Sequence, residues 1–241
     1  MPVSLRGVVT VLLAGTGSDD DYVGRAFGQP LRRAGAVLVA PAPEPLDLVG
    51  GYLRALDAAA VAGPIAVGGV SLGAAVAAAW AVRNPAGTVA VLAALPPWTG
   101  APYDAPASVS ARTTAAELQR AGLDAVTAAM RSSSPSWLAD ELSRSWAAQW
   151  PGLPEAMVQA AGYVAPDRSE LGRLVAPMGV VAASDDHVHP LDVAREWVAC
   201  APHAALRTVE LAEFGPDPTR LGDACLRALR EAGEAFRPGS G

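Results

Sequence analysis

One serine stands in a glycine-flanked segment that could present a nucleophile. The residues Gly69-Val70-Ser71-Leu72-Gly73 follow a short apolar run and precede a stretch rich in alanine. A serine at a sharp strand-to-helix turn takes a strained backbone conformation, and small neighbours let the turn pass close to adjacent backbone. The hydroxyl then lies at a helix N-terminus, where the free amide of Leu72 and the helix dipole favour a developing oxyanion. The pattern therefore predicts that Ser71 is a nucleophile.

Glycine-rich turns can also cradle phosphate, which is the alternative interpretation of this segment. A second such loop, Gly15-Thr16-Gly17, follows the first apolar run. It lacks the third glycine of a dinucleotide-binding fingerprint and the lysine of a P-loop. Nucleotide binding is therefore the weaker hypothesis for both loops.

Two aspartates and two histidines stand together in the segment Ala183-Ser184-Asp185-Asp186-His187-Val188-His189-Pro190. Carboxylate and imidazole groups are the usual partners that activate a serine hydroxyl. If the segment follows a strand parallel to the one before Ser71, either His187 or His189 could reach that hydroxyl. A histidine one or three residues from its acid partner is expected to be poorly placed to receive the usual hydrogen bond from it. The alternative is a solvated acidic loop that caps the next helix.

The elements that would position these groups alternate between apolar strands and helices. The expected strands are Gly7–Ala14, Ala36–Ala40, Pro64–Gly68, Thr88–Leu95, Met178–Ala183 and Leu206–Leu211. The expected helices of this alternation are Asp21–Ala34, Leu46–Ala62, Leu72–Arg83, Leu191–Cys200 and Asp217–Phe236. Such alternation predicts an α/β fold with a doubly wound, mostly parallel six-stranded sheet.

The alternation is interrupted once, between residues 98 and 176. This stretch contains only short helical patterns, at Thr113–Ala121, Leu123–Arg131, Pro135–Gln149 and Pro154–Val164. We therefore expect a core domain formed by residues 1–97 and 177–241, with a helical cap inserted at 98–176.

With these segments in this order, nearly the whole chain resembles the α/β-hydrolase superfamily. In that family the nucleophile elbow follows the third strand of a minimal sheet, as Ser71 does here. The later aspartate segment looks like the family's G-x-x-D-x-x-x-P acid loop, with Ala183 at the glycine position, which implies that Asp186 is the acid. The first glycine loop sits where the family carries His-Gly-x, with Ala14 in place of the noncatalytic histidine. The resemblance implies that the amide of Thr16 is a second oxyanion donor beside that of Leu72.

The sequence departs from the family pattern at the base. The family's histidine follows the last strand, and here Pro216 stands at roughly that position. The remaining candidates are His189, His187 or a water molecule held by Asp217. The third histidine, His203, precedes the last strand and is expected at the opposite end of the sheet.

Glycine and tryptophan residues near the expected site are candidates for substrate contact. Gly15 belongs to the first glycine loop, and Trp98 follows the fourth strand at the edge where small ligands bind open α/β sheets. The cap tryptophans have a packing explanation. Trp146 and Trp150 share one helix face and could anchor the cap, whereas Trp137 falls on the opposite face, towards a neighbouring cap helix.

Composition limits the classes of partner. The net charge is −6 and the arginines form no basic stripe, so we expect no nucleic acid partner. The chain shows neither a leader pattern nor a membrane-length apolar run, so we expect a cytoplasmic protein without a membrane partner. Cys200 and Cys225 are expected to be reduced. We expect a small-molecule substrate, no cofactor and no metal, and both a monomer and a homodimer stay open.

Two functional hypotheses follow from these residues. The first is a serine hydrolase, an esterase or thioesterase, that acts on small apolar carboxylic esters or thioesters. The second is a catalytically degenerate or non-hydrolytic use of the same fold for ligand binding, cyclisation or proton transfer. The second is motivated by Pro216, because a serine without a base is a weak nucleophile.

Overall fold

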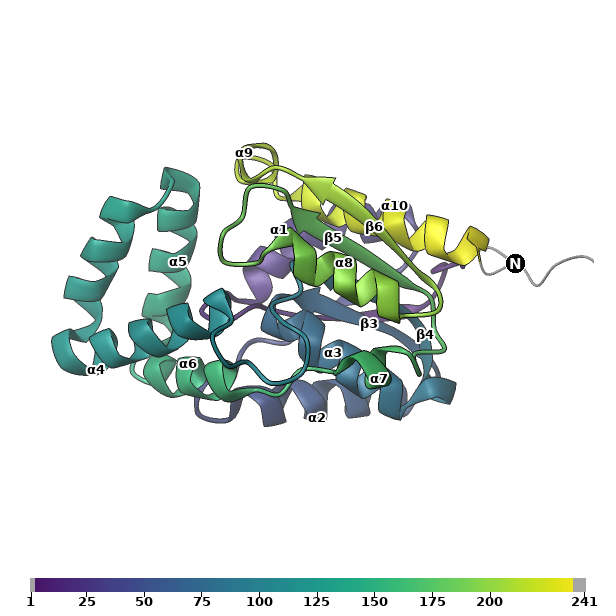
Figure 1. Cartoon of the computed structure of the whole chain (residues 1–241), viewed down its shortest axis with the longest axis horizontal. Helices are drawn as coiled ribbons and strands as arrows, with labels where there is room; N and C mark the ends of the chain where they lie inside the picture. The colour runs from purple at the N-terminus through teal and green to yellow at the C-terminus, as the bar shows by residue number, and fades with distance from the viewer. Residues whose placement is uncertain (1–2, 236–241) are drawn as a thin grey trace, which may run out of the picture.

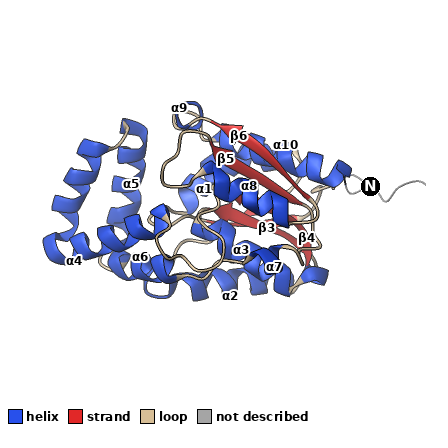
Figure 2. Cartoon of the chain, in the orientation of Figure 1, coloured by secondary structure: helices blue, strands red, loops and turns tan. Residues whose placement is uncertain are grey.

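The computed structural model describes residues 3–235, and its centre is a six-stranded sheet in which all paired strands are parallel (Figures 1 and 2). The strands lie in the order β2-β1-β3-β4-β5-β6. They span β1 (Val9–Leu13), β2 (Val37–Val39), β3 (Ile65–Val70), β4 (Thr88–Ala94), β5 (Met178–Ala183) and β6 (Ala204–Val209). The expected doubly wound α/β fold with a six-stranded sheet is confirmed.

Helices cover both faces of the sheet, because successive strand residues point to opposite sides. One face packs on α1 (Asp20–Arg33) and α10 (Thr219–Ala235), and the other on α2 (Leu48–Ala60), α3 (Leu72–Arg83) and α8 (Leu191–Cys200). In β1, Leu12 packs in the apolar core on the side of α1 and α10. Val11 and Leu13 pack in the apolar core on the side of α2, α3 and α8. Burial on both faces explains why the strands read as continuous apolar runs.

Four helices separate β4 from β5 along the chain, and the first three of them lie at one end of the molecule (Figure 1). They are α4 (Pro106–Ser133), α5 (Ser136–Gln149), α6 (Leu153–Gly162) and the short α7 (Arg168–Leu171). Helix α4 contains a break at Gly122, whose φ is 79° and ψ is 171°, where the sequence separates two helical patterns. A small apolar core of its own, which includes Trp146 and Met157, joins α4, α5 and α6. We call these four helices the insert.

The last strand and the segment after it differ from expectation. Strand β6 ends at Val209, two residues before the expected end, because Glu210 and Glu213 form a capping box that begins the short helix α9 (Leu211–Phe214). Two 3₁₀ turns, η1 (Pro45–Asp47) and η2 (Pro85–Gly87), were also not expected. The expected end of the closing helix, Phe236, lies outside the described residues.

Two further features concern the cysteines and the length of the helices. Cys200 and Cys225 are both free, and burial raises the pKa of the Cys225 thiol. Among residues 3–235, no helix is both long enough and apolar enough to cross a membrane.

Close packing around Ser71 depends on glycine. A Cβ atom at Gly73, in the first turn of α3, would lie 2.7 Å from the carbonyl oxygen of Ala14 and would also meet the carbonyl oxygen of Leu13. Both carbonyls are backbone, so neither can swing away. The first turn of α3 can therefore approach β1 this closely only with hydrogen at that position.

We predict that Gly73→Ala lowers the free energy of unfolding by about 1–3 kcal/mol, the usual cost of overpacking. The control is Gly24→Ala in α1, where a Cβ would meet nothing within 4 Å and the backbone is already helical. That change should stabilise by about 0.4–1 kcal/mol, because alanine restricts the unfolded chain. Urea denaturation compares the two, and equal stability of both variants would contradict the packing argument.

Candidate active site

Ser71 occupies a strained turn between β3 and α3. Its φ of 52° and ψ of −117° lie in a region that residues with a side chain rarely adopt, at a cost of about 1–3 kcal/mol. Two hydrogen bonds hold the turn: the Ser71 N–H donates to the carbonyl of Ala94 at 2.9 Å, and the Ala75 N–H donates to the carbonyl of Ser71 at 3.2 Å. The hydroxyl is therefore held at the N-terminus of α3.

The side chains of Ser71, His189 and Asp186 form one hydrogen-bonded row. The Nε2 atom of His189 lies 2.9 Å from the Ser71 hydroxyl oxygen. The Nδ1 atom of His189 lies 2.8 Å from Oδ2 of Asp186. A carboxylate can only accept, so Nδ1 carries the proton, and Nε2 is left to accept from the hydroxyl. This arrangement suits a nucleophile, a general base and an acid that orients the base.

The position of His189 corrects one sequence-based expectation. A histidine three residues from its acid partner was expected to be poorly placed, yet Asp186 and His189 are in direct contact. The loop makes this possible because Oδ1 of Asp186 accepts from the backbone N–H groups of Val188 at 2.7 Å and His189 at 3.2 Å. The tight turn brings the imidazole back over the other carboxylate oxygen. Side-chain-closed turns of this kind are typical of aspartate.

The neighbouring candidates have different surroundings. The side chain of His187 is exposed, and the imidazole that contacts Ser71 is that of His189. Oδ1 of Asp185 accepts from the N–H of Leu211 at 2.9 Å, which ties the acid loop to the start of α9. Asp185 therefore supports the loop, while Asp186 contacts the histidine.

The acid is kept ionised by its hydrogen bonds. Burial acts to raise the pKa of the Asp186 carboxyl, but its interactions with the His189 imidazole and with the N–H groups of Val188 and His189 outweigh it. The pKa of Asp186 consequently lies below its ordinary value. The side chains of His189 and Asp186 are only 15% and 10% exposed, so solvent has little access to the pair.

The two amides expected to form an oxyanion hole flank the elbow. A Cβ atom on Gly15 would lie 3.4 Å from Cβ of Ser71, so the loop after β1 packs directly against the turn. Thr16 follows Gly15, and Leu72 begins α3. Within residues 3–235, no loop carbonyl or side chain accepts from the N–H of Thr16 or Leu72. Two donors at this edge thus remain available to an acceptor from outside the chain.

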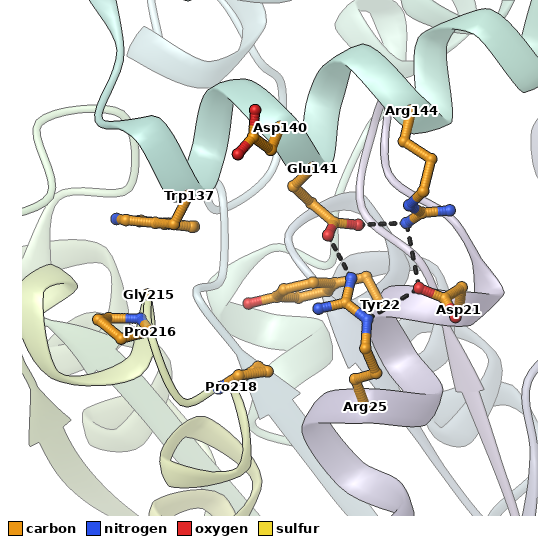
Figure 3. Close-up of a pocket in the computed structure, with 10 residues that line it drawn as sticks. All are labelled: Asp21, Tyr22, Arg25, Trp137, Asp140, Glu141, Arg144, Gly215, Pro216 and Pro218. Carbon is orange, nitrogen blue, oxygen red and sulfur yellow. Dashed lines mark hydrogen bonds and ion pairs between the residues drawn. The ribbon is translucent and has the colours of Figure 1, made fainter.

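Trp98 and Pro216 lie in other surroundings. Trp98 is 5% exposed, and its indole N–H donates to the carbonyl of Tyr163 at 3.1 Å, so its contact with substrate stays a prediction. Pro216 lies in the loop before α10, on the wall of a cleft of about 400 Å³ between α1, α5 and that loop (Figure 3). Trp137 on α5 packs its ring against Phe214, with centroids 5.7 Å apart, rather than against a neighbouring helix of the insert.

Three carboxylates beside this cleft could in principle hold a cation. Oxygen atoms of Asp19, Asp21 and Glu141 lie within 4.8 Å of one another. The guanidinium groups of Arg25 and Arg144 already pair with them, as Figure 3 shows for Asp21 and Glu141. The positive charge that such a cluster needs is therefore supplied by the chain itself.

The hydrogen bonds of Asp186 give a pH prediction. A carboxyl whose folded pKa lies below its unfolded value of about 3.9 adds stability above that value and loses it as the pH falls through the folded pKa. Asp186→Asn should therefore lower the free energy of unfolding by about 1 kcal/mol near pH 7, since hydrogen bonds to a neutral amide are weaker. The difference from the unaltered protein should shrink below pH 4. Urea titrations at pH 7 and pH 3 measure this difference in the free energy of unfolding. A difference independent of pH would refute the lowered pKa of Asp186.

Comparison with known proteins identifies the fold. No family model and no curated protein matches the sequence. The structure is similar to a carboxylesterase of the thaumarchaeon Nitrososphaera gargenis, with 16% identity, a TM-score of 0.73, and 96% of this chain and 93% of that chain covered. A thermophilic esterase from Thermogutta terrifontis gives 16% identity, a TM-score of 0.71, and coverage of 94% and 91%.

A third structure, MenH from S. aureus, matches at 14% identity with a TM-score of 0.70 and coverage of 94% and 95%. At identities this low, similarity reports on the chain path rather than on substrate or chemistry. The path is shared over almost the full length of each compared chain, and the sheet is parallel throughout. The resemblance noted in the sequence is thus confirmed at the level of architecture, and the protein has the α/β-hydrolase fold.

Proposed function

We propose that this protein is a serine hydrolase that acts on small, mostly apolar carboxylic esters or thioesters. The observation that carries the proposal is the continuous row from the Ser71 hydroxyl through His189 to Asp186, with contacts of 2.9 and 2.8 Å. Both distances fall within the hydrogen-bond range expected for a nucleophile, its base and the orienting acid. The family's usual base position is taken by Pro216, and His189 supplies the imidazole from the acid loop instead.

The chemistry follows from these contacts. Nε2 of His189 removes the hydroxyl proton as the oxygen of Ser71 attacks the substrate carbonyl, and the N–H groups of Thr16 and Leu72 donate to the resulting oxyanion. His189 then gives the proton to the departing alkoxide or thiolate, which leaves an acyl group on Ser71. A water molecule, deprotonated by His189, attacks this acyl-enzyme. His189 returns that proton to the departing Ser71 oxygen as the carboxylic acid is released. Asp186 stays ionised and stabilises the imidazolium that forms twice in the cycle.

The proposed substrate size rests on burial. Ser71 is 9% exposed, and its two partners are similarly covered. Leu72, the next residue in sequence, and Ala94, whose carbonyl accepts from the Ser71 N–H, are also buried and apolar. Such surroundings favour a short acyl group without charge.

The alternative, a non-hydrolytic use of the fold, was motivated by the missing histidine after the last strand. With an imidazole in contact with the Ser71 hydroxyl, that motive no longer applies. The non-hydrolytic alternative differs from the proposal in one measurable respect: ligand binding or proton transfer without acylation would not require the serine hydroxyl.

We predict that a fluorophosphonate probe labels the protein at Ser71 and that p-nitrophenyl acetate turns over faster than in buffer. Ser71→Ala should abolish labelling, and His189→Ala should lower kcat by a factor on the order of 10⁴–10⁶, since loss of a nucleophile or base of this kind has comparable effects. The matched control is His187→Ala, which removes an exposed imidazole from the same loop and should change kcat less than about twofold.

The outcomes separate the hypotheses. An unlabelled Ser71 together with ester hydrolysis no faster than in buffer would refute the hydrolase proposal. Equal losses in His187→Ala and His189→Ala would show that the acid loop matters only for folding. A function that survives Ser71→Ala would favour the non-hydrolytic alternative.

A second prediction concerns acyl length. Because the reacting groups are nearly buried, kcat/KM for p-nitrophenyl esters should be highest for acetate to butyrate and at least tenfold lower for dodecanoate. A series of even-numbered esters, assayed below the micelle-forming concentration, measures this. A steady rise in kcat/KM up to twelve carbons would contradict the small-substrate assignment.

A further inference from the structure

The loop between β1 and α1 contains a chain of linked peptide groups. The N–H of Ser18 donates to the carbonyl of Gly15 at 3.0 Å. A peptide unit is planar and trans, so the carbonyl of Gly15 and the N–H of Thr16 belong to one rigid plane and point in opposite directions. The Ser18 N–H therefore fixes the direction of the Thr16 N–H.

Helix α5 of the insert holds the next peptide of this loop. The hydroxyl of Ser145 donates to the carbonyl of Gly17, which belongs to the same peptide unit as the N–H of Ser18. Ser145 has no exposed surface. Two rigid peptide planes thus connect the Ser145 hydroxyl to the N–H of Thr16, and each carbonyl accepts from the group before it.

Other side chains of α5 fasten the same stretch. Nε2 of Gln149 donates to the carbonyl of Ser18 at 3.0 Å, and Gln149 is almost fully buried. Arg144 donates to both carboxylate oxygens of Asp19 at 2.6 and 3.0 Å, and Asp19 in turn caps the N-terminus of α1. Figure 3 shows Arg144 reaching from α5 towards α1. Consecutive residues of the loop are therefore held by one helix.

The approach of α5 to the loop is too close for a side chain at Gly17. Its φ is +71°, and a Cβ atom there would lie 2.7 Å from Nε1 of Trp146 and 3.3 Å from a methyl carbon of Met157. Trp146 is itself 5% exposed. Thus the insert packs directly on the loop rather than over solvent.

From these contacts we propose that Ser145 is a positioning residue, which aims the N–H of Thr16 at the oxyanion through the two-peptide chain. The inference rests on the proposed hydrolase function, because it needs Thr16 as an oxyanion donor. A donor stabilises a transition state most when its direction is fixed before reaction. The linked bonds also polarise one another, which strengthens the last donor in the series. The insert thereby helps to position an oxyanion donor.

The test is Ser145→Ala in the full chain, with p-nitrophenyl acetate as substrate. Removal of a whole oxyanion donor costs about 10²–10³ in kcat. Here the donor stays but is less well held, so we expect kcat to fall about tenfold with KM changed less than twofold. The inhibition constant of phenylboronic acid, which forms a tetrahedral adduct with serine, should rise by a similar factor. That of acetate, the planar product, should not change.

Two further variants complete the design. Ser143 lies on the same helix, and its hydroxyl donates to the carbonyl of Ala139 within α5 instead of reaching the loop. Ser143→Ala should therefore match the unaltered protein in kcat, KM and boronate affinity. Gln149→Met has a side chain of similar length but no donor for the Ser18 carbonyl. It should lower kcat in the same direction as Ser145→Ala, which protects the test if Ser145→Ala folds poorly. Thermal unfolding of each variant establishes that it is folded.

The results distinguish failure of the hydrolase proposal from failure of the positioning role of Ser145. If the unaltered protein neither reacts with the fluorophosphonate nor hydrolyses esters, the hydrolase proposal fails and this inference fails with it. If the unaltered protein is active and folded Ser145→Ala and Gln149→Met keep kcat and boronate affinity within twofold, the positioning role alone is overturned. A rise in KM with kcat unchanged would also overturn it, because that pattern reports a loss of uniform binding.

Discussion

The carboxylate of Asp186 makes the contacts on which the arrangement of the site depends. One oxygen accepts from the backbone N–H groups of Val188 and His189, and the other accepts from the His189 imidazole. The same group therefore closes the turn and selects the tautomer that leaves Nε2 facing Ser71. Strands β3 and β5 flank β4, so their ends lie roughly 10 Å apart at the usual strand spacing. The side chains of Ser71 and His189 bridge that gap, because the turn brings the imidazole over the Asp186 carboxylate with Nε2 2.9 Å from the Ser71 hydroxyl oxygen.

With Asp186 and His189 on one loop, the proposed hydrolase mechanism needs no catalytic group from the segment after β6. Glu210 and Glu213 cap the short α9 there, and Asp185 accepts from the N–H of Leu211. Phe214 packs against Trp137 of α5. The segment that holds the base in the resembling family thus supports the acid loop on one side and the insert on the other. A proline at position 216 carries no ionisable group, and the observed contacts do not require one.

The sequence predicted what is encoded locally and missed what depends on tertiary contact or on turn closure. Buried apolar runs predicted the sheet, and the glycines around Ser71 predicted the elbow, because each constraint acts within a few residues. His189 was named as a candidate, but its hydrogen bond to Asp186 was not foreseen, since it depends on how the turn closes. Aspartate at the first position of that turn was the available indication. The hydrogen bond from Ser145 to the carbonyl of Gly17 joins residues 128 positions apart, so no local sequence pattern indicates it.

The contacts between α5 and the body of the protein differ in what they can contribute. The pairs of Arg25 and Arg144 with Asp21 are largely exposed, and such pairs usually contribute little to stability. The Ser145 bond is buried and the Gln149 bond is partly buried, and leaving a buried acceptor unpaired would cost about 1–3 kcal/mol. Because these bonds end on the carbonyls of Gly17 and Ser18, which follow Thr16, undocking of α5 would leave the loop without its supports. Under the proposed mechanism, the order of this loop therefore requires α5 to stay docked.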